Sequence, residues 1–160
     1  MEPRSASAGA GAGHGEPLPA PPWSFVSSGI EETLALGRRI GAACQGGEVI
    51  LLDGPMGAGK TLLTQGIAAG LGIDGAIVSP TFVVMRTYRG GRGLTLHHFD
   101  FYRLGGEEDL ESVGLEDCLR GDAVVVIEWP SRAPAAAGRH TLLLRLAVVG
   151  EEARRISAEG

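Results

Sequence analysis

Two kinds of hydrophobic pattern alternate along the chain, and together they predict a mixed α/β domain. Residues 49–52 and 124–127 are apolar at every position, which is typical of strands buried on both faces of a sheet. Between these runs, residues 60–71 have the composition and length of a helix, and Gly72 directly after them is a common helix terminator. Parallel strands joined through a crossover helix are the expected arrangement.

A further helix is expected near the start of the folded region. Ser28-Gly29-Ile30-Glu31 matches the S-x-x-E capping box, in which the serine and glutamate side chains satisfy backbone N–H groups at a helix start. We expect this helix to end near residues 45–47, with apolar side chains near one face at Ile30, Leu34 and Ile40.

The rest of the pattern predicts a hairpin, an interrupted helix and one more strand. These elements are 83–88 and 94–99 with a turn at 90–93, then 107–119 with a break at Gly114, and 142–149. We therefore expect a single-domain α/β fold with a mixed sheet flanked by helices. The order of the strands stays open, because the pattern does not say which strands are neighbours.

Composition separates the start of the chain from the rest. Residues 1–22 are rich in Ala, Gly and Pro, and such a segment has too little apolar surface to offset the entropy of ordering. We predict a disordered tail over 1–22 and a folded domain over 23–158. The tail lacks the apolar stretch of a secretory signal. No run approaches the roughly 18–20 apolar residues of a membrane-spanning helix, so we expect a cytoplasmic protein with no membrane partner.

The cysteines and the charge exclude further classes of function. Cys44 and Cys118 form no CxxC or Cys/His cluster, so neither a zinc site nor a disulfide framework is expected. The formal net charge is −5 at pH 7, without a clustered basic segment, which argues against an extended nucleic-acid-binding surface. Lys60 is the only lysine in the sequence, and its position is the main chemical clue.

Residues 54–61 fit the P-loop pattern G-x-x-x-x-G-K-[ST]. In this motif the glycines let backbone N–H groups surround phosphate oxygens, and the following helix directs its positive end at them. The lysine binds the β- and γ-phosphates, and the threonine hydroxyl is a Mg²⁺ ligand. A strand before and a helix after favour this interpretation over a chance glycine turn. We expect a P-loop NTPase-like fold with phosphate contacts from Gly54, Pro55, Met56, Gly57, Ala58, Gly59, Lys60 and Thr61.

A P-loop also requires a carboxylate for the metal and a group that orients the attacking water. Glu128 directly follows the run 124–127, and Asp100 ends another predicted strand. The alternatives are an exposed acid at a strand end for Glu128 and a surface or capping role for Asp100. His97 and His98 are expected to pack or form hydrogen bonds rather than bind metal, since Mg²⁺ prefers oxygen ligands.

Ser79-Pro80-Thr81-Phe82 lies between the P-loop helix and the next strand. In P-loop switches, a loop at this place presents a hydroxyl to the γ-phosphate and Mg²⁺. A plain turn that contains proline fits the same residues. Asp53, directly before the P-loop, is expected to shape the turn rather than to catalyse.

Four segments together resemble the bacterial TsaE (YjeE) family, small ATPases required for threonylcarbamoyladenosine formation in tRNA. They are GPMGAGKT at 54–61, SPTF at 79–82, HHFDFYRL at 97–104 and VVVIEWP at 124–130. TLALG at 33–37 and EAR at 152–154 also fit, so the resemblance covers nearly all of residues 24–156. Many proteins share the P-loop, whereas the other three segments together are much more specific.

The resemblance implies roles for individual residues. It implies that Asp100 and Glu128 serve Mg²⁺ binding and hydrolysis, that Thr61 is a metal ligand, and that Lys60 acts on the phosphates. A packed core aromatic is the alternative for Trp129, which the resemblance puts beside the nucleotide. The nucleotide contacts implied outside the P-loop are Thr81, Trp129, Ser28, Gly29 and Arg154.

We therefore hypothesise a Mg²⁺-dependent ATPase that acts as an accessory protein, because the family implies TsaD and TsaB type partners that carry out the transfer to tRNA. The chain would then meet tRNA only indirectly, through the complex. Weak turnover alone is expected, since no arginine finger is assured in cis and Arg103 is the nearest internal candidate. One alternative is a small nucleotide or metabolite kinase, for which the loop 89–93 is a very short lid. The other is a nucleotide-gated binding module without hydrolysis.

Overall fold

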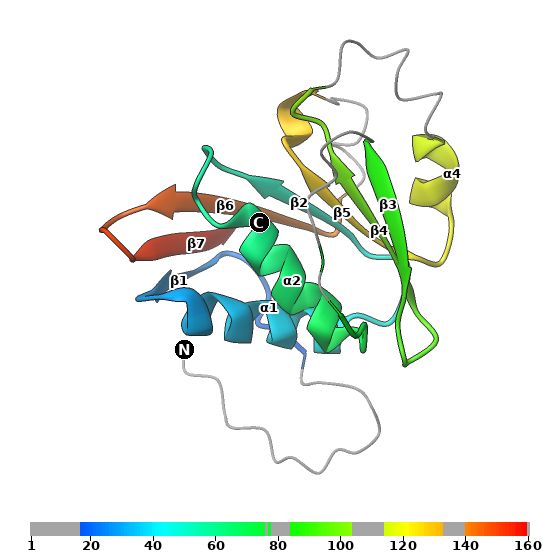
Figure 1. Cartoon of the computed structure of the whole chain (residues 1–160), viewed down its shortest axis with the longest axis horizontal. Helices are drawn as coiled ribbons and strands as arrows, with labels where there is room; N and C mark the ends of the chain where they lie inside the picture. Colours follow the sequence, from blue (N-terminus) through cyan, green and yellow to red (C-terminus); the bar gives the residue numbers. More distant parts are fainter. Residues whose placement is uncertain (1–16, 76, 78–83, 104–113, 133–139, 160) are drawn as a thin grey trace.

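A seven-stranded mixed sheet forms the centre of the described part of the chain, in the order β1-β7-β6-β2-β5-β4-β3 (Figure 1). The computed structural model describes residues 17–75, 77, 84–103, 114–132 and 140–159. The strands are β1 Trp23–Ser27, β2 Val49–Asp53, β3 Met85–Arg89, β4 Thr95–Asp100, β5 Val124–Glu128, β6 Leu142–Val148 and β7 Arg154–Glu159. The described helices are α1 Ile30–Ala43, α2 Lys60–Gly70 and α4 Leu115–Arg120, with a 3-10 turn, η1, over Pro130–Arg132.

The parallel part of the sheet positions the P-loop. β2 pairs in parallel with β5 and β6, and β5 pairs in parallel with β4. The outer pairs β3–β4, β6–β7 and β1–β7 are antiparallel. The carboxyl ends of β2, β5 and β4 therefore meet at one edge of the sheet, and ligands of open α/β sheets bind at such an edge.

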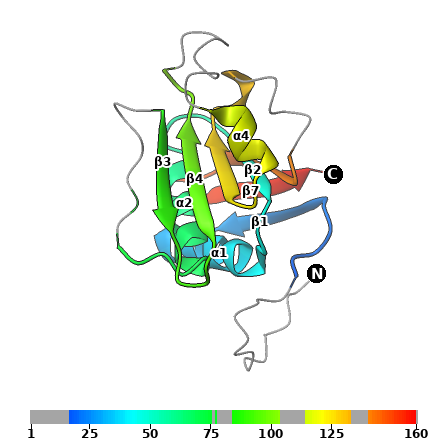
Figure 2. The same cartoon turned by 90° about the vertical axis from the view of Figure 1, so that its right-hand side faces the viewer.

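Each face of the sheet has its own hydrophobic core. Along β2, Ile50 and Leu52 belong to the core that also contains side chains of α1 and α2. Val49 and Leu51 alternate with them and belong to the second core, which contains Leu115 of α4. Figures 1 and 2 show α1 and α2 together on one side of the sheet and α4 on the other. The continuous apolar run of β2 is thus explained by burial on both faces.

Glycines on both helices allow α1 and α2 to pack closely. A Cβ atom on Gly41 of α1 would lie 2.1 Å from the carbonyl oxygen of Ile67. A Cβ atom on Gly66 of α2 would lie 2.5 Å from the carbonyl oxygen of Leu34. Side chains at these positions would force the helices apart. The contact fixes α1 against α2, whose first residue is Lys60.

Most predicted elements are confirmed with small changes in their bounds. The predicted strands and the P-loop helix correspond to β2, the β3–β4 hairpin, β5, β6 and α2. Of the predicted helix 107–119, α4 forms the part after Gly114, and residues 107–113 lie outside the described residues. The first and last strands, β1 and β7, were not predicted, because neither carries a continuous apolar run like those of β2 and β5. Residues 1–16 of the predicted tail 1–22 lie outside the described part, so the tail stays a prediction there, whereas Leu18 is described and packs against the core that contains α1 and α2.

The predicted capping box of Ser28 and Glu31 is wrong. β1 continues to Ser27, and Gly29 is the N-cap of α1, without a hydrogen bond from a capping side chain. The third residue of the helix is therefore Glu32, whose Oε1 accepts a hydrogen bond from the Ser28 N–H at 2.9 Å. The extension of β1 shifts the helix start by one residue relative to the sequence prediction.

The buried face of α1 also differs in part from the prediction. Ile40 is buried and Leu34 is half-buried, but Ile30 in the first turn is 63% exposed. Leu36 takes a place in the core instead. α1 has 14 residues, and none of the described helices combines the length and apolar character needed to cross a membrane.

Candidate functional site

The P-loop connects the carboxyl end of β2 to the start of α2. Gly57 and Gly59 have φ angles of 80° and 102°, in the left-handed region that glycine adopts without steric cost. Gly54 lies against β6, where a Cβ atom would be 2.5 Å from the Leu146 carbonyl oxygen. The glycines are therefore required by the path of the loop. The loop leads directly into the N-terminus of α2, which carries partial positive charge.

The side chain of Lys60 folds back over this loop. Its Nζ donates hydrogen bonds to the carbonyl oxygens of Gly54 at 2.5 Å and Pro55 at 2.9 Å, and it lies 4.2 Å from the centre of the Trp129 ring. Lys60 is only 6% exposed. Burial lowers the pKa of its ammonium group, and the negative charge of Glu128 opposes part of this shift. The chain's single lysine is thus a desolvated cation beside the phosphate-binding motif.

Glu128 ends β5 and is buried, at 3% exposure. Its Oε2 lies 3.4 Å from the Thr61 hydroxyl, which donates to it, and 2.7 Å from Nε2 of His98. Thr61 belongs to α2, and His98 belongs to β4. The structure therefore brings Glu128 to the P-loop, and the alternative of an exposed acid at a strand end is wrong.

Asp100 lies beside Glu128 at the same edge of the sheet. The two residues are partners in the parallel register of β4 and β5. The Oδ1 of Asp100 accepts a hydrogen bond from the Tyr102 N–H at 3.0 Å, so this carboxylate also shapes the turn after β4. Asp100 therefore fits both expectations, because it caps the turn after β4 and also lies beside Glu128.

The two histidines form hydrogen bonds, as expected. His98 is fully buried and pairs with Glu128. The Nδ1 of His97 lies 2.9 Å from the Thr87 hydroxyl on the neighbouring strand β3. The adjacent histidines thus point to different partners, and only His98 reaches the P-loop side of the sheet.

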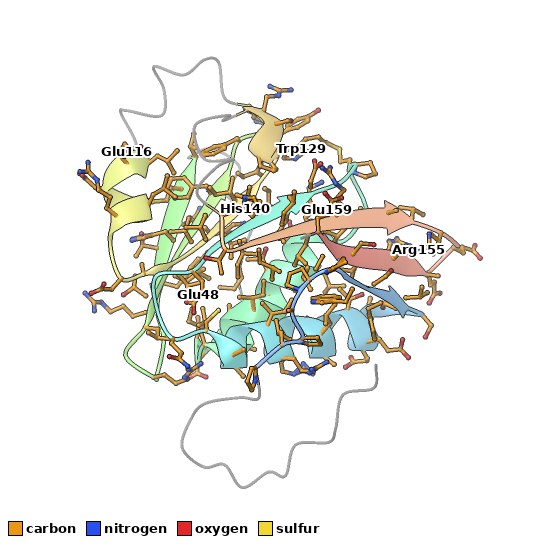
Figure 3. The ribbon with its side chains drawn as sticks, turned by 180° about the vertical axis from the view of Figure 1, so that it is seen from behind. Glu48, Glu116, Trp129, His140, Arg155 and Glu159 are labelled. Carbon is orange, nitrogen blue, oxygen red and sulfur yellow. The ribbon has the colours of Figure 1, made fainter. Side chains whose placement is uncertain are left out.

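Trp129 and Tyr102 form an aromatic wall next to Lys60. Their ring centres are 5.0 Å apart, and the guanidinium of Arg132 lies 5.8 Å from the centre of the Tyr102 ring. Trp129 has a φ angle of 62°, the only positive value at a non-glycine position among the described residues. Figure 3 shows Trp129 at the end of β5, far from Glu48 at the opposite end of the sheet. Such backbone strain is concentrated at functional sites.

The P-loop, Asp100, Glu128 and the aromatic wall line one cavity of about 900 Å³. Its size suits a ligand larger than inorganic phosphate. The sequence-predicted residues that line it are Gly29, Met56, Gly57, Gly59, Lys60, Thr61, Asp100, Arg103, Glu128, Trp129 and Arg154.

The remaining predicted residues have other places. Ala58 is buried under the loop, and Gly54 and Pro55 meet the site through the carbonyls that Lys60 contacts. Ser28 is exposed and directs its N–H to Glu32, not into the cavity. Thr81 lies outside the described residues.

The cavity also has lining residues that sequence reasoning missed. Ile30 and Thr33 come from the first turn of α1, and Glu151 and Glu152 come from the β6–β7 turn. Glu152 belongs to the segment EAR at 152–154 that fits the family resemblance, whereas no local pattern points to Glu151. The guanidinium of Arg154 donates to the carbonyl oxygens of Gly150 and Ala153 of the same turn.

The donor set at this edge of the sheet fits Mg²⁺. The Thr61 hydroxyl and the Asp100 and Glu128 carboxylates are oxygen donors that line the same cavity. The described residues contain no group of three or more His, Cys, Asp or Glu side chains that could by itself hold a metal ion. Mg²⁺ is commonly bound by one or two carboxylates together with substrate phosphates, rather than by an all-protein cage.

Comparisons with known proteins show which family the chain is similar to. The sequence model of the family described as threonylcarbamoyl adenosine biosynthesis protein TsaE matches residues 27–156. Among relatives named tRNA threonylcarbamoyladenosine biosynthesis protein TsaE, one from Treponema pallidum is 38% identical over 132 residues, 82% of this chain and 96% of the relative. One from Mycobacterium leprae is 43% identical over 119 residues, 69% of this chain and 74% of the relative.

A solved structure is also similar to this chain in fold. The crystal structure of Bacillus subtilis YdiB is similar with a TM-score of 0.70 and 28% identity, and the match covers 86% of this chain and 84% of that one. The resemblance drawn from the sequence motifs is therefore confirmed. The chain belongs to the TsaE family of threonylcarbamoyladenosine biosynthesis proteins.

Proposed function

We propose that the chain is a Mg²⁺-dependent ATPase that acts as an accessory protein in threonylcarbamoyladenosine formation on tRNA, together with TsaD and TsaB type proteins. One observation carries the proposal: the buried Glu128 carboxylate lies 3.4 Å from the Thr61 hydroxyl, in the cavity that Lys60 also lines. P-loop NTPases use a lysine, a Ser/Thr hydroxyl and a carboxylate near one another at the phosphates and the metal. The family description supports the tRNA pathway.

Binding of ATP is assigned to the P-loop and α2. The loop N–H groups and the start of α2 hold the β- and γ-phosphates, and Lys60 exchanges its two carbonyl partners for phosphate oxygens. Thr61 and Asp100 would hold Mg²⁺, which, when bound, neutralises charge on the phosphate oxygens. The aromatic wall of Trp129 and Tyr102 shields Lys60 from water, and a charge acts more strongly in such an environment.

Hydrolysis is assigned to Glu128. Its carboxylate accepts a hydrogen bond from the attacking water and takes up the water proton as the oxygen–phosphorus bond forms. The bond between the γ-phosphorus and its bridging oxygen breaks, and the electron pair leaves with ADP. The proton then passes to solvent with the released phosphate. Arg103 lines the cavity, and a cation supplied by a partner would complete the charge stabilisation.

The test measures ADP and inorganic phosphate in parallel from ATP and Mg²⁺, with the full chain alone and with TsaD and TsaB. Lys60→Ala removes the cation, and Glu128→Gln removes the carboxylate while keeping its shape. Glu116→Gln is the matched control, because Glu116 is an exposed carboxylate on α4, away from Trp129 (Figure 3). We expect slow phosphate release that rises with the partners, disappears in the first two variants and persists in the control.

Other outcomes separate the alternatives. Formation of ADP without equivalent free phosphate would indicate transfer to an acceptor, as in a kinase. ATP binding without release of ADP or phosphate, with or without the partners, would leave a nucleotide-gated binding module as the better account. Either result would contradict the proposed ATPase.

A further inference from the structure

His98 is a buried polar side chain to which the proposed hydrolysis assigns no task. It lies on β4, two residues before Asp100, and has no exposed surface. Its Nε2 is 2.7 Å from Oε2 of Glu128, a short contact between two buried side chains. Hydrogen bonds to a charged acceptor are stronger than neutral ones, and more so away from water.

The surroundings of the ring define which nitrogen carries the proton. Nδ1 is buried and has no hydrogen-bond partner among the described residues. An ionised carboxylate only accepts hydrogen bonds, so Nε2 is the ring nitrogen that donates to Oε2 of Glu128.

This hydrogen bond restricts the orientation of the Glu128 carboxylate. The terminal torsion of a glutamate is broad and has weak intrinsic preference. Among the described residues, the carboxylate has hydrogen bonds with His98 and Thr61, and both involve Oε2. Rotation about this torsion is therefore restrained, and Oε1 is the oxygen that remains for the cavity that Glu128 lines.

We propose that His98 is a positioning residue whose Nε2–H holds Oε2 of Glu128 and leaves Oε1 to accept the hydrogen bond from the attacking water. The inference rests on the proposed role of Glu128 in hydrolysis. Partners that orient a functional carboxylate typically change activity about 10- to 100-fold when they are removed. The effect is expected on turnover, because the P-loop contacts with phosphate do not involve His98.

The kinetic test compares two adjacent histidines. His98→Leu removes the donor, whereas His98→Gln offers an amide N–H at a similar distance from the backbone. His97→Leu and His97→Gln are the matched controls, since His97 pairs with Thr87 and not with Glu128. In the presence of TsaD and TsaB, we expect kcat to fall about 10- to 100-fold in His98→Leu and to recover in part in His98→Gln. The Kd for ATP, measured by calorimetry, should stay unchanged, and both His97 variants should resemble the wild-type chain.

A spectroscopic test does not depend on turnover. The chain is labelled with ¹⁵N-histidine, and the nitrogen shifts of His98, assigned with the His98→Gln variant, report which ring nitrogen carries hydrogen. We expect the Nε2–H tautomer in the wild-type chain and a clear shift of its Nε2 signal in Glu128→Gln. This measurement remains decisive if His98→Leu does not fold.

Three results would overturn the proposal. The first is an Nδ1–H tautomer, or an Nε2 signal that is indifferent to Glu128→Gln. The second is wild-type kcat in a folded His98→Leu chain. The third is an equal loss of kcat and ATP affinity in both His98 variants, which would show a structural role only. If the wild-type chain does not hydrolyse ATP in any company, the proposed function and the catalytic consequence for His98 fail together. The nitrogen spectrum then still decides whether His98 holds Glu128.

Discussion

The ammonium group of Lys60 lies 4.2 Å from the centre of the Trp129 ring while it donates hydrogen bonds to two P-loop carbonyls. A cation over an indole ring is attracted to the ring face, and the attraction is stronger where water is excluded. The lysine of the phosphate-binding motif and the tryptophan after β5 therefore interact directly. Any ligand that draws Lys60 toward phosphate also changes the environment of Trp129.

We predict that ATP changes the fluorescence of Trp129. The chain has two tryptophans, Trp23 and Trp129, so Trp23→Phe isolates the signal of interest. Titration of this variant with ATP and Mg²⁺ should give a saturable change in emission. The Trp129→Phe chain, which keeps Trp23 on β1, should give none. A response confined to Trp23 would contradict the assignment of the nucleotide to this cavity.

The close contact of α1 and α2 predicts that Gly41→Ala destabilises the fold. The added Cβ would lie 2.1 Å from the Ile67 carbonyl oxygen, so the helices must separate. Such overpacking costs about 1–3 kcal/mol, against a gain in helix propensity of about 1 kcal/mol. Urea unfolding measures the net loss. Gly121→Ala is the control, because its Cβ would be 3.5 Å from the Asp117 carbonyl oxygen, an ordinary contact.

Arg92 in the β3–β4 turn connects the ends of both packed helices. Its guanidinium donates to the carbonyl oxygens of Gly41 at 3.1 Å, Cys44 at 2.7 Å and Gly70 at 3.2 Å. A cation at two helix C-termini satisfies free carbonyl groups and complements the helix dipoles. We expect Arg92→Met to lower the free energy of unfolding by about 1–3 kcal/mol.

The control for Arg92 is Arg89→Met. Arg89 is exposed on β3, and its loss should change the urea midpoint little. Equal midpoints for the wild-type chain and Arg92→Met would show that these three hydrogen bonds contribute nothing to stability. The urea midpoint of Arg92→Lys should lie between those of the wild-type chain and Arg92→Met, because lysine keeps the charge but loses the several N–H donors of the guanidinium.

The thiol of Cys44 should be unreactive in the folded chain. Cys44 is 4% exposed, and its Sγ donates to the Ile40 carbonyl oxygen at 3.4 Å. Burial raises its pKa to about 12, so very little thiolate is present at neutral pH. In the Cys118→Ser chain, an aromatic disulfide reagent should modify Cys44 only after addition of denaturant. Rapid modification in native buffer would mean that this part of α1 opens readily.

His97 gives the stability of the chain a defined pH dependence. Burial lowers the pKa of its imidazole below the ordinary value of 6.5. The unfolded chain therefore binds this proton at a higher pH than the folded chain does. The contribution is complete above about pH 6.5 and is lost as the pH falls through that value toward the folded-state pKa. The urea midpoint is measured above and below this pH window. Its decrease between the two pH values should be smaller in His97→Gln than in the wild-type chain.

Features that depend on neighbouring residues could be predicted from the sequence alone. The P-loop is a contiguous motif, and the apolar runs of β2 and β5 identify buried strands because burial on both faces requires apolar side chains at every position. Combined motifs also identified the family. A helix start depends on where the preceding strand ends, which is why the capping position at Ser28 was predicted wrongly.

Contacts between groups that are distant in the sequence follow from the three-dimensional fold. Thr61 and Glu128 are 67 positions apart, and His98 and Glu128 are 30 apart. Their contacts follow from the order β2-β5-β4 and from the parallel register that sets Asp100 beside Glu128. β1 and β7 acquire their structure from the antiparallel partners that they find at the sheet edge. Spacing along a chain constrains only the local backbone geometry. The order of the strands depends on how whole faces of the sheet become buried, and no single segment of the sequence specifies this.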